Sequence, residues 1–526
     1  MFPETRFRNW INKLNKNVIL AFASTIVIGL ICHVYMMTNK WVNLDDIVQL
    51  VDKMDRTTSG RWFLQYPSAI GSEFSLPWIN GLLTIIYSAI MSVFIVKMFN
   101  IKSKVNTILI SGILITFPTI GSLMPFMNTQ DSYQFGAMLA GIGAYILIKK
   151  KWGFLVTTIL LTLSLAIYQT YLGYAAGLIF IYLVLKLFEE RDNFKNIFEL
   201  FIKTGISFVV AIGLYLFVSR VIFGHLLVDY KGLDKMGSIP LSEIPKAVLN
   251  TYIEMYKFLA GLEFNYHFPF MRYLFAGSFV MIIFLIYYIM KTVNIDKNKK
   301  IFAIFILFIS PIAINVIYIM SWEAGVMLRM AYAYTTIFII PLLLIDFIVK
   351  HKQRLIDNDD EEIKNSNFMK ETVYFSAWFI TITSIMSIYN NIYVTNKAYF
   401  KVGITNQSSH AYGNRIVQRL EMLKGYKTDT QIVFLGNPDS RTGFTPRIDT
   451  PDIEPFIIAN HLTRLYSFKY YPTRFLGFPN PIKDYDKIEK DIEHLRNKIK
   501  SMPLYPAEES IEMIDDVIYV KFKEID

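Results

Sequence analysis

Apolar segments of about 20 residues, the length needed to cross a bilayer, recur along this chain between residues 18 and 390. Of its 526 residues, 53% are hydrophobic and only 18% are charged, and a water-soluble core could not enclose that much apolar surface. We therefore expect an α-helical polytopic membrane protein with about 11 transmembrane helices. The expected spans are 18–37, 79–97, 105–124, 132–148, 153–168, 170–187, 204–223, 271–290, 301–320, 331–349 and 372–390.

Lys and Arg are unevenly distributed between the two sides of these spans. If the N-terminus is cytoplasmic, the inner segments carry 23 Lys and Arg and the outer segments carry nine. Because positive charge favours the cytoplasmic side, we expect this orientation, and an odd number of spans then leaves the C-terminal region outside. The formal net charge of +10 is explained by contact with lipid headgroups, so no nucleic-acid partner is expected.

The composition changes after the last span, and residues 391–526 are polar. We expect a membrane domain over 1–390 and a small extracytoplasmic α/β domain over 391–526. The patterns predict a helical face ending at Leu423, strands at Gln431–Leu435 and Val517–Phe522, and a helix over Asp484–Ile499. Asp439 and Arg441 follow the first of these strands, where either a ligand site or an ordinary surface loop is expected.

Two adjacent carboxylates, Asp45 and Asp46, follow the first span almost at once. Carboxylates at such a boundary are costly unless they face a wet cleft or a cation, which makes them candidates for function. A short amphipathic helix is predicted to begin just after the pair, so the acids would lie at a helix start. In the alternative interpretation, Asn43 and the two acids only cap that helix. The apolar residues whose spacing predicts this short helix are Ile47, Leu50, Val51 and Met54.

Further polar residues collect near the outer ends of the spans. A carboxylate such as Asp45, Asp46 or Asp131 can accept a hydroxyl proton as a general base. Arg61 and Arg329 can bind a phosphate. Singly, Asp131 could cap a helix, Arg61 could anchor at the interface and Arg329 could pair with Glu323. Candidates for contact with a sugar or acceptor are Trp62, Tyr168, Gln169, Tyr171, His267, Trp322 and Glu323.

Several other signals are weak or missing. His267 lies in an aromatic cluster at 264–270 that suits either an interfacial belt or a sugar-stacking platform. His33, inside the first span, is interpreted as a packed core residue. The sequence shows no metal-binding Cys and His spacing, no P-loop and no dinucleotide fingerprint. We expect no metal site, and a membrane enzyme of this kind would use an already activated substrate.

The chain resembles the GtrII-type glucosyltransferases, membrane enzymes of the GT-C class. The resemblance rests on the acidic pair, on Ser59-Gly60-Arg61-Trp62, on Ser75-Leu76-Pro77 and on the acidic second loop Asn128–Asp131. The closing segments Met502–Pro506 and Ile514–Ile518 agree with it. It implies a GT-C-like fold and a bacterial plasma-membrane location. It also implies inverting transfer of a hexose from a polyprenyl-phosphate donor to a surface polysaccharide, with Asp45, or its rival Asp46, as the base and Asp131 as a supporting acid.

The resemblance implies no cofactor beyond at most a weak dependence on divalent cations. A cytoplasmic-side donor synthase and a flippase are the other partners it implies, besides the donor, the acceptor and the bilayer. The rival function is a flippase or exporter of lipid-linked glycans. A transporter predicts polar residues spread through the spans and two related halves, whereas the polar residues of this chain gather at one side. A non-catalytic scaffold would leave the acidic pair without a role.

Overall fold

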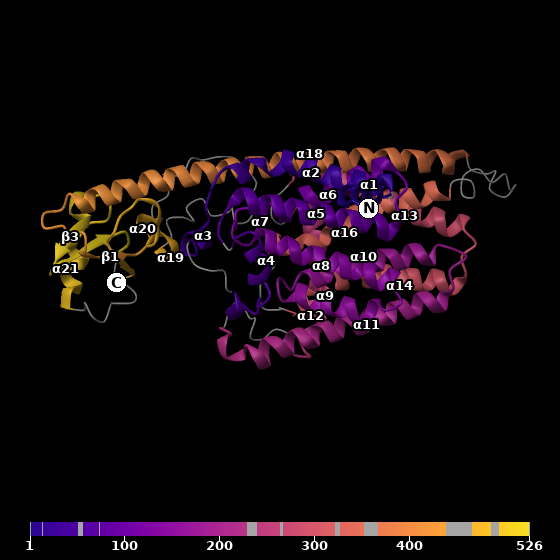
Figure 1. Ribbon diagram of the computed structural model, residues 1–526, viewed down its shortest axis with the longest axis horizontal. Coiled ribbons are helices and arrows are strands. Elements are labelled where there is room, and N and C mark those ends of the chain that lie inside the picture. Colours follow the sequence, from indigo (N-terminus) through magenta and orange to yellow (C-terminus); the bar gives the residue numbers. More distant parts are fainter. Residues whose placement is uncertain are drawn as a thin grey trace.

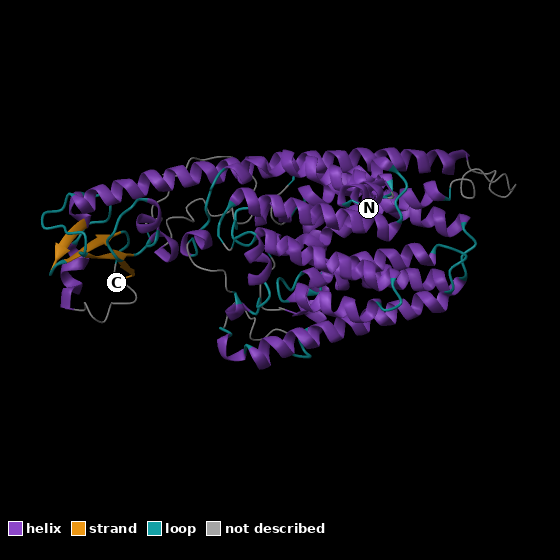
Figure 2. Ribbon diagram, in the orientation of Figure 1, coloured by secondary structure: helices purple, strands orange, loops and turns teal. Residues whose placement is uncertain are grey.

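The computed structural model describes residues 2–12, 14–50, 56–72, 74–228, 239–262, 267–320, 327–351, 367–437, 465–484 and 494–524. The protein is mostly helical and elongated, with a bundle of helices at one end and a small sheet at the other (Figure 1). Figure 2 shows that the described strands are confined to that second end. One long helix, α18, runs along the molecule and joins the two parts (Figure 1).

The bundle is built from helices of very different lengths. Those longer than nine residues are α1 (Pro3–Asn12), α2 (Lys16–Thr38), α5 (Pro77–Phe99), α6 (Lys104–Thr116), α8 (Gln130–Lys149), α9 (Gly153–Leu165), α10 (Tyr171–Leu187), α11 (Phe194–Phe217), α12 (Ile244–Ala260), α13 (Met271–Thr292), α14 (Lys297–Ile314), α16 (Thr335–Lys350) and α18 (Asn367–Glu421). The shorter ones are α3 (Leu44–Val48), α4 (Gln65–Ile70), α7 (Pro118–Leu123), α15 (Ile317–Met320), α19 (Leu465–Phe468), α20 (Tyr471–Phe475), α21 (Arg496–Ser501), and the 3-10 or π turns η1 (Thr57–Ser59), η2 (Val218–Ile222), η3 (Gly224–Leu226), η4 (Leu328–Tyr334) and η10 (Glu508–Ser510).

Within the described residues, seven helical stretches are long and apolar enough to cross a membrane. They are 16–38, 77–99, 104–123, 194–222, 271–292, 328–350 and 368–421, and α9 and α10 are shorter apolar helices. Each of the eleven predicted segments overlaps one or two helices. The membrane class is thus supported, whereas the count of about 11 spans is not confirmed.

Local sequence signals explain several helix ends. The Asn15 side chain accepts a hydrogen bond from the Asn17 amide at the start of α2. Pro118 begins α7, and extended backbone at the preceding Phe117 separates α7 from α6. A predicted single span over 105–124 is therefore two helices. The helix predicted from residue 204 begins ten residues earlier, at Phe194.

Polar groups inside the bundle are held by other parts of the chain. His33 is completely buried, and its two ring nitrogens lie 2.7 Å from the Tyr399 hydroxyl and 2.9 Å from the Ile115 carbonyl. The interpretation of His33 as a packed, hydrogen-bonded core residue is confirmed. Since Tyr399 belongs to α18, this contact fixes the long helix against α2 and α6.

At the other end, four short strands form one sheet in the order β2-β1-β4-β3. β1 (Gln431–Leu435) pairs in parallel with β2 (Ile482–Asp484) and with β4 (Val517–Lys521). β3 (Ile511–Ile514) and β4 form an antiparallel hairpin, and its turn residues Asp515 and Asp516 have φ values of 49° and 60°. Left-handed backbone at both turn residues matches the twist of a tight hairpin.

Both predicted strands are confirmed, but two other expectations change. Asp484 ends strand β2 instead of starting a helix, and the helix nearest to the prediction is α21 (Arg496–Ser501). The proposed boundary at residue 390 lies inside α18, which continues without a break to Glu421. A helix of 55 residues is about 80 Å long, enough to cross a bilayer and reach well beyond it.

One close helix contact depends on a glycine. A Cβ atom added at Gly173 in α10 would lie 2.1 Å from the Ile314 carbonyl oxygen in α14. Because that oxygen is backbone, we expect Gly173→Ala to push the two helices apart and to lower the free energy of unfolding by about 1–3 kcal/mol. Thermal unfolding in detergent measures this. A Cβ at Gly213 in α11 would meet nothing within 4 Å. Gly213→Ala is therefore the control, and equal melting temperatures for the two variants would contradict the packing argument.

Candidate active site

The acidic pair lies on α3, and Asn43 caps that helix. The Asn43 side-chain oxygen accepts hydrogen bonds from the amides of Asp45 at 2.7 Å and Asp46 at 3.0 Å. Its side-chain nitrogen donates to the Pro125 carbonyl at 2.8 Å, so the cap also ties α3 to the loop before α8. The helix was predicted to begin just after the acidic pair, but it begins at Leu44, so both acids lie in its first turn, and it ends at Val48. Two residues of the predicted helical face, 51 and 54, lie outside the described residues.

Asp46 is completely buried and joins three segments. Its carboxylate accepts a hydrogen bond from the Ser75 hydroxyl at 3.0 Å and from the amides of Met127 at 3.3 Å and Asn128 at 3.4 Å. Burial raises the pKa of Asp46 to about 7, although these three hydrogen bonds oppose the increase. Asp46 thus connects α3 to the residues just before α5 and to the loop at 124–129.

Asp45 has a different environment, because its side chain remains 31% exposed. The Arg56 guanidinium lies 3.7 Å from its carboxylate and donates a 2.8 Å hydrogen bond to the Gln49 side-chain oxygen. The same Gln49 oxygen accepts from the Asn128 side chain at 3.2 Å. Asp45 is therefore a carboxylate that lies near a cation and remains accessible to solvent. Its neighbour Asp46, in contrast, is buried and accepts three hydrogen bonds from the protein.

Asp131 lies at the start of α8 and is also completely buried. It makes no ion pair, and neither of its carboxylate oxygens has a hydrogen-bond partner, within the described part of the chain. A Cβ at Gly71 would lie 3.0 Å from one Asp131 oxygen and 2.5 Å from the Asn80 side-chain oxygen. A side chain at residue 71 would therefore have to displace these oxygens, which both lie close to the end of α4. The Asn80 side-chain nitrogen donates to the Met127 carbonyl, which links Asn80 to the segment that bonds Asp46.

Arg61 packs into a group of tyrosines. It donates to the Tyr133 hydroxyl at 3.0 Å, and its guanidinium lies 5.0 Å from the centre of the Tyr168 ring. Gln169 donates to the Tyr215 hydroxyl at 2.8 Å. The structure buries three of the predicted sugar contacts, which are Tyr168, Gln169 and Tyr171. They lie in the protein interior and not on an open surface.

The other predicted residues are dispersed. The Arg329 guanidinium lies 5.1 Å from the centre of the Phe126 ring, next to the loop that bonds Asp46. Trp62 donates to the Ser219 hydroxyl at 3.2 Å and stacks on Phe223. His267 packs edge-on against Phe275 at the start of α13. Trp322 and Glu323 lie outside the described residues, and so do Asp439 and Arg441.

The C-terminal part packs directly on α3. The Arg474 guanidinium donates to the carbonyls of Ile47 and Val48, the last two residues of that helix. Ile47 belongs to the same buried apolar cluster as Phe468 and Tyr471. The C-terminal end of α3, the helix that carries the acidic pair, therefore packs against the C-terminal part of the chain (Figure 1).

Sequence reasoning missed Arg56, Gln49 and Arg474. Arg56 and Gln49 could have been found, because they lie in the same loop as the acids and carry a cation and an amide. Arg474 could not, since more than 400 residues separate it from α3 and no pattern marks the contact. Within the described residues, no group of three or more His, Cys, Asp or Glu side chains is arranged to hold a metal ion.

The fold and the site define a helical membrane protein with a carboxylate site at one end of its bundle. The sequence model described as Glucosyl transferase GtrII matches residues 34–345, more than half of the chain. The protein therefore belongs to the GtrII glucosyltransferase family. The match includes Asp45, Asp46, Arg61, Asp131 and Arg329, and the C-terminal sheet lies beyond it. No curated protein and no solved structure matches the chain.

The raised pKa of Asp46 predicts a pH-dependent stability. A buried acid whose folded-state pKa is about 7 binds its proton more tightly when folded than when unfolded, where the value is 3.8. The contribution of Asp46 to the free energy of unfolding is therefore complete below about pH 4 and is lost as the pH rises through about 7. We expect the melting temperature of the wild type to fall over this range and the fall to be smaller in Asp46→Asn. An unchanged pH profile in that variant would contradict the assignment.

Arg474 predicts a coupling between the C-terminal domain and α3. Removal of its guanidinium in Arg474→Ala leaves two helix-terminal carbonyls without their donor. We expect amide hydrogen exchange over residues 44–50 to become about tenfold faster, which corresponds to the loss of one or two hydrogen bonds. Lys469→Ala is a matched control, because its ammonium, like the Arg474 guanidinium, lies over the Tyr470 ring. Equal exchange in both variants would show that Arg474 does not hold α3.

Proposed function

We propose that the protein transfers a glucose or related hexose from a polyprenyl-phosphate donor to a polysaccharide at the outer face of a bacterial plasma membrane. Family membership supports the glucosyl transfer. The observation that carries the site assignment is the unequal environment of the acidic pair. Asp46 is buried and accepts three hydrogen bonds, whereas Asp45 is partly exposed. Asp45 is therefore the general base in this proposal, and Asp46 is a positioning residue.

The proposed step is an inverting displacement. The Asp45 carboxylate takes the proton of an acceptor hydroxyl, whose oxygen forms a bond to the anomeric carbon from the side opposite the phosphate. The bond between that carbon and the phosphate oxygen breaks, and the polyprenyl phosphate leaves with the electron pair. Because the donor is already activated, the reaction needs no resident cofactor. Arg56 keeps the Asp45 side chain in place, 3.7 Å away.

Arginine side chains would hold the leaving phosphate. Arg61 is the stronger candidate, because its guanidinium is ordered by Tyr133 in α8 and by Tyr168 in the segment between α9 and α10. The burial of Tyr168, Gln169 and Tyr171 supports a role in fixing Arg61 and the surrounding helices. Arg329, beside Phe126, is the second candidate for charge stabilisation.

The orientation belongs to the same proposal. The contact of α3 with the C-terminal domain puts the acidic pair and the sheet at the same end of the bundle. This agreement supports the expectation that both are extracytoplasmic, opposite the lysine-rich segments. A donor synthase on the cytoplasmic side and a flippase would supply the lipid-linked sugar. The C-terminal domain would then cover the site or recognise the acceptor glycan.

The proposed base predicts a specific kinetic defect. In membranes given a radiolabelled polyprenyl-phosphate sugar, we expect Asp45→Asn to lower the transfer rate by 10²–10⁴-fold, the usual contribution of general base catalysis. The substitution should leave the melting temperature nearly unchanged, because the side chain is partly exposed. Asp192→Asn, a carboxylate paired with Lys186 at the opposite end of the bundle, should transfer at the wild-type rate. More than a tenth of wild-type activity in Asp45→Asn would remove Asp45 as the base.

A further inference from the structure

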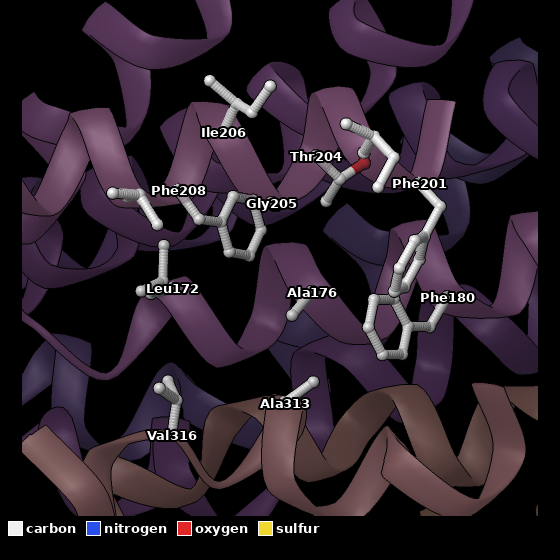
Figure 3. Close-up of a pocket in the computed structure, with 12 residues that line it drawn as sticks. Leu172, Ala176, Phe180, Phe201, Thr204, Gly205, Ile206, Phe208, Ala313 and Val316 are labelled. Atoms are coloured by element: carbon white, nitrogen blue, oxygen red, sulfur yellow. The ribbon is translucent and has the colours of Figure 1, made fainter. Parts of the chain in front are cut away.

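A cavity of about 460 Å³ lies between α10, α11 and the C-terminal end of α14. Figure 3 shows side chains from these three elements converging on it. The lining is apolar, and its one hydroxyl, that of Thr204, already donates to the Leu200 carbonyl at 2.8 Å. The cavity therefore offers no group that would hold water or a polar ligand.

The cavity is elongated along the helices. Its wall on α10 is formed by Leu172, Ala176 and Phe180, which are spaced one turn apart over about 12 Å. The facing wall on α11 extends from Phe201 to Val209, an equal length. This is the shape of a groove for a single extended chain that lies parallel to the helices.

The groove is accessible from the bilayer. α11 is part of a candidate span, and its groove residues Ile206 and Val209 are 49% and 70% exposed. A peptide in this position would bury unsatisfied backbone groups. A hydrocarbon chain from the bilayer meets no such cost.

One end of the groove lies near Arg61. The Arg61 guanidinium lies 5.0 Å from the centre of the Tyr168 ring, and Tyr168 comes four residues before the groove residue Leu172. Trp62, the neighbour of Arg61, donates to the Ser219 hydroxyl in the turn that follows α11. An apolar groove that ends near a guanidinium group suits a chain attached to a phosphate.

We propose that this groove binds the prenyl chain of the lipid-linked donor, with the phosphate toward Arg61. The inference rests on the proposed function for the identity of the lipid, and it adds the place of the chain. The first isoprene units lie beside Leu172, and the following units pass Ala176 and Gly205 toward Phe180.

Two glycines on α11 provide a matched test. Gly205 lines the groove, and a Cβ added there would meet nothing within 4 Å, so the side chain of Gly205→Leu has room to begin in the groove and occupies part of it. A Cβ at Gly213, about two turns further along, is equally unobstructed, and Gly213 is not part of the lining. Both substitutions improve helix propensity, so neither should unfold the protein.

The experiment measures transfer kinetics of the full-length protein in nanodiscs. With a long-chain polyprenyl-phosphate sugar, Gly205→Leu should raise KM at least about tenfold at unchanged kcat, which corresponds to the loss of roughly two buried methylene contacts. With a donor of two isoprene units, it should change KM much less. Gly213→Leu should resemble the wild type with both donors. Equal KM values for the two variants, or an equal effect on both donors, would overturn the proposal.

A second experiment, photo-crosslinking, tests lipid binding in the groove independently of the transferase activity. A polyprenyl phosphate with a diazirine group should label α10 and α11 in the wild type and in Gly213→Leu, but not in Gly205→Leu. If the wild type transfers no sugar and this labelling pattern is still found, the proposed function fails while the groove stands. Equal labelling of both variants would overturn the groove. Displacement of the label by equimolar phosphatidylglycerol would show a general lipid site and would also overturn it.

Discussion

The hydrogen bonds of one buried carboxylate, Asp46, determine how one end of this helix bundle is assembled. They connect α3 to Ser75 before α5 and to the amides of Met127 and Asn128. Because an ionised group is costly to bury without such partners, the three segments must close around it together. This arrangement leaves Asp45, the adjacent residue, at the edge of the network and accessible. Two neighbouring carboxylates thus acquire different chemistry from burial alone.

The same helix is held from its other end by a distant part of the chain. α18 passes from the bundle to the C-terminal sheet, and Arg474 in α20 bonds the last carbonyls of α3. A short helix of five residues has little stability of its own, so it depends on these tertiary contacts. The C-terminal domain therefore contributes to the geometry of the acidic pair, although the family match ends before it at residue 345.

The sequence was most informative where one physical constraint acts locally. Bilayer-length apolar segments predicted the helices, an apolar run followed by Gly436 predicted strand β1, alternation predicted strand β4, and the preference of Asn for caps anticipated the role of Asn43. It was least informative where contacts are distant. It could not rank Asp45 against Asp46, because the ranking depends on hydrogen bonds from residues 75, 127 and 128. It offered Tyr168, Gln169 and Tyr171 as sugar contacts, and the structure buries them. It also divided the chain at residue 390, because an apolar span that continues as a polar helix changes composition without any break in the backbone.

The central claim is that the reaction takes place at Asp45, on the accessible side of the Asp46 network. A structure of the protein bound to a non-transferable phosphonate analogue of a polyprenyl-phosphate sugar tests it most directly. The account predicts the phosphonate beside Arg61, with the anomeric carbon and an acceptor-sized space facing the Asp45 carboxylate and the Asp46 hydrogen bonds intact. A sugar bound at the lysine-rich end of the bundle, or one that reaches Asp46 after those hydrogen bonds have broken, would contradict it.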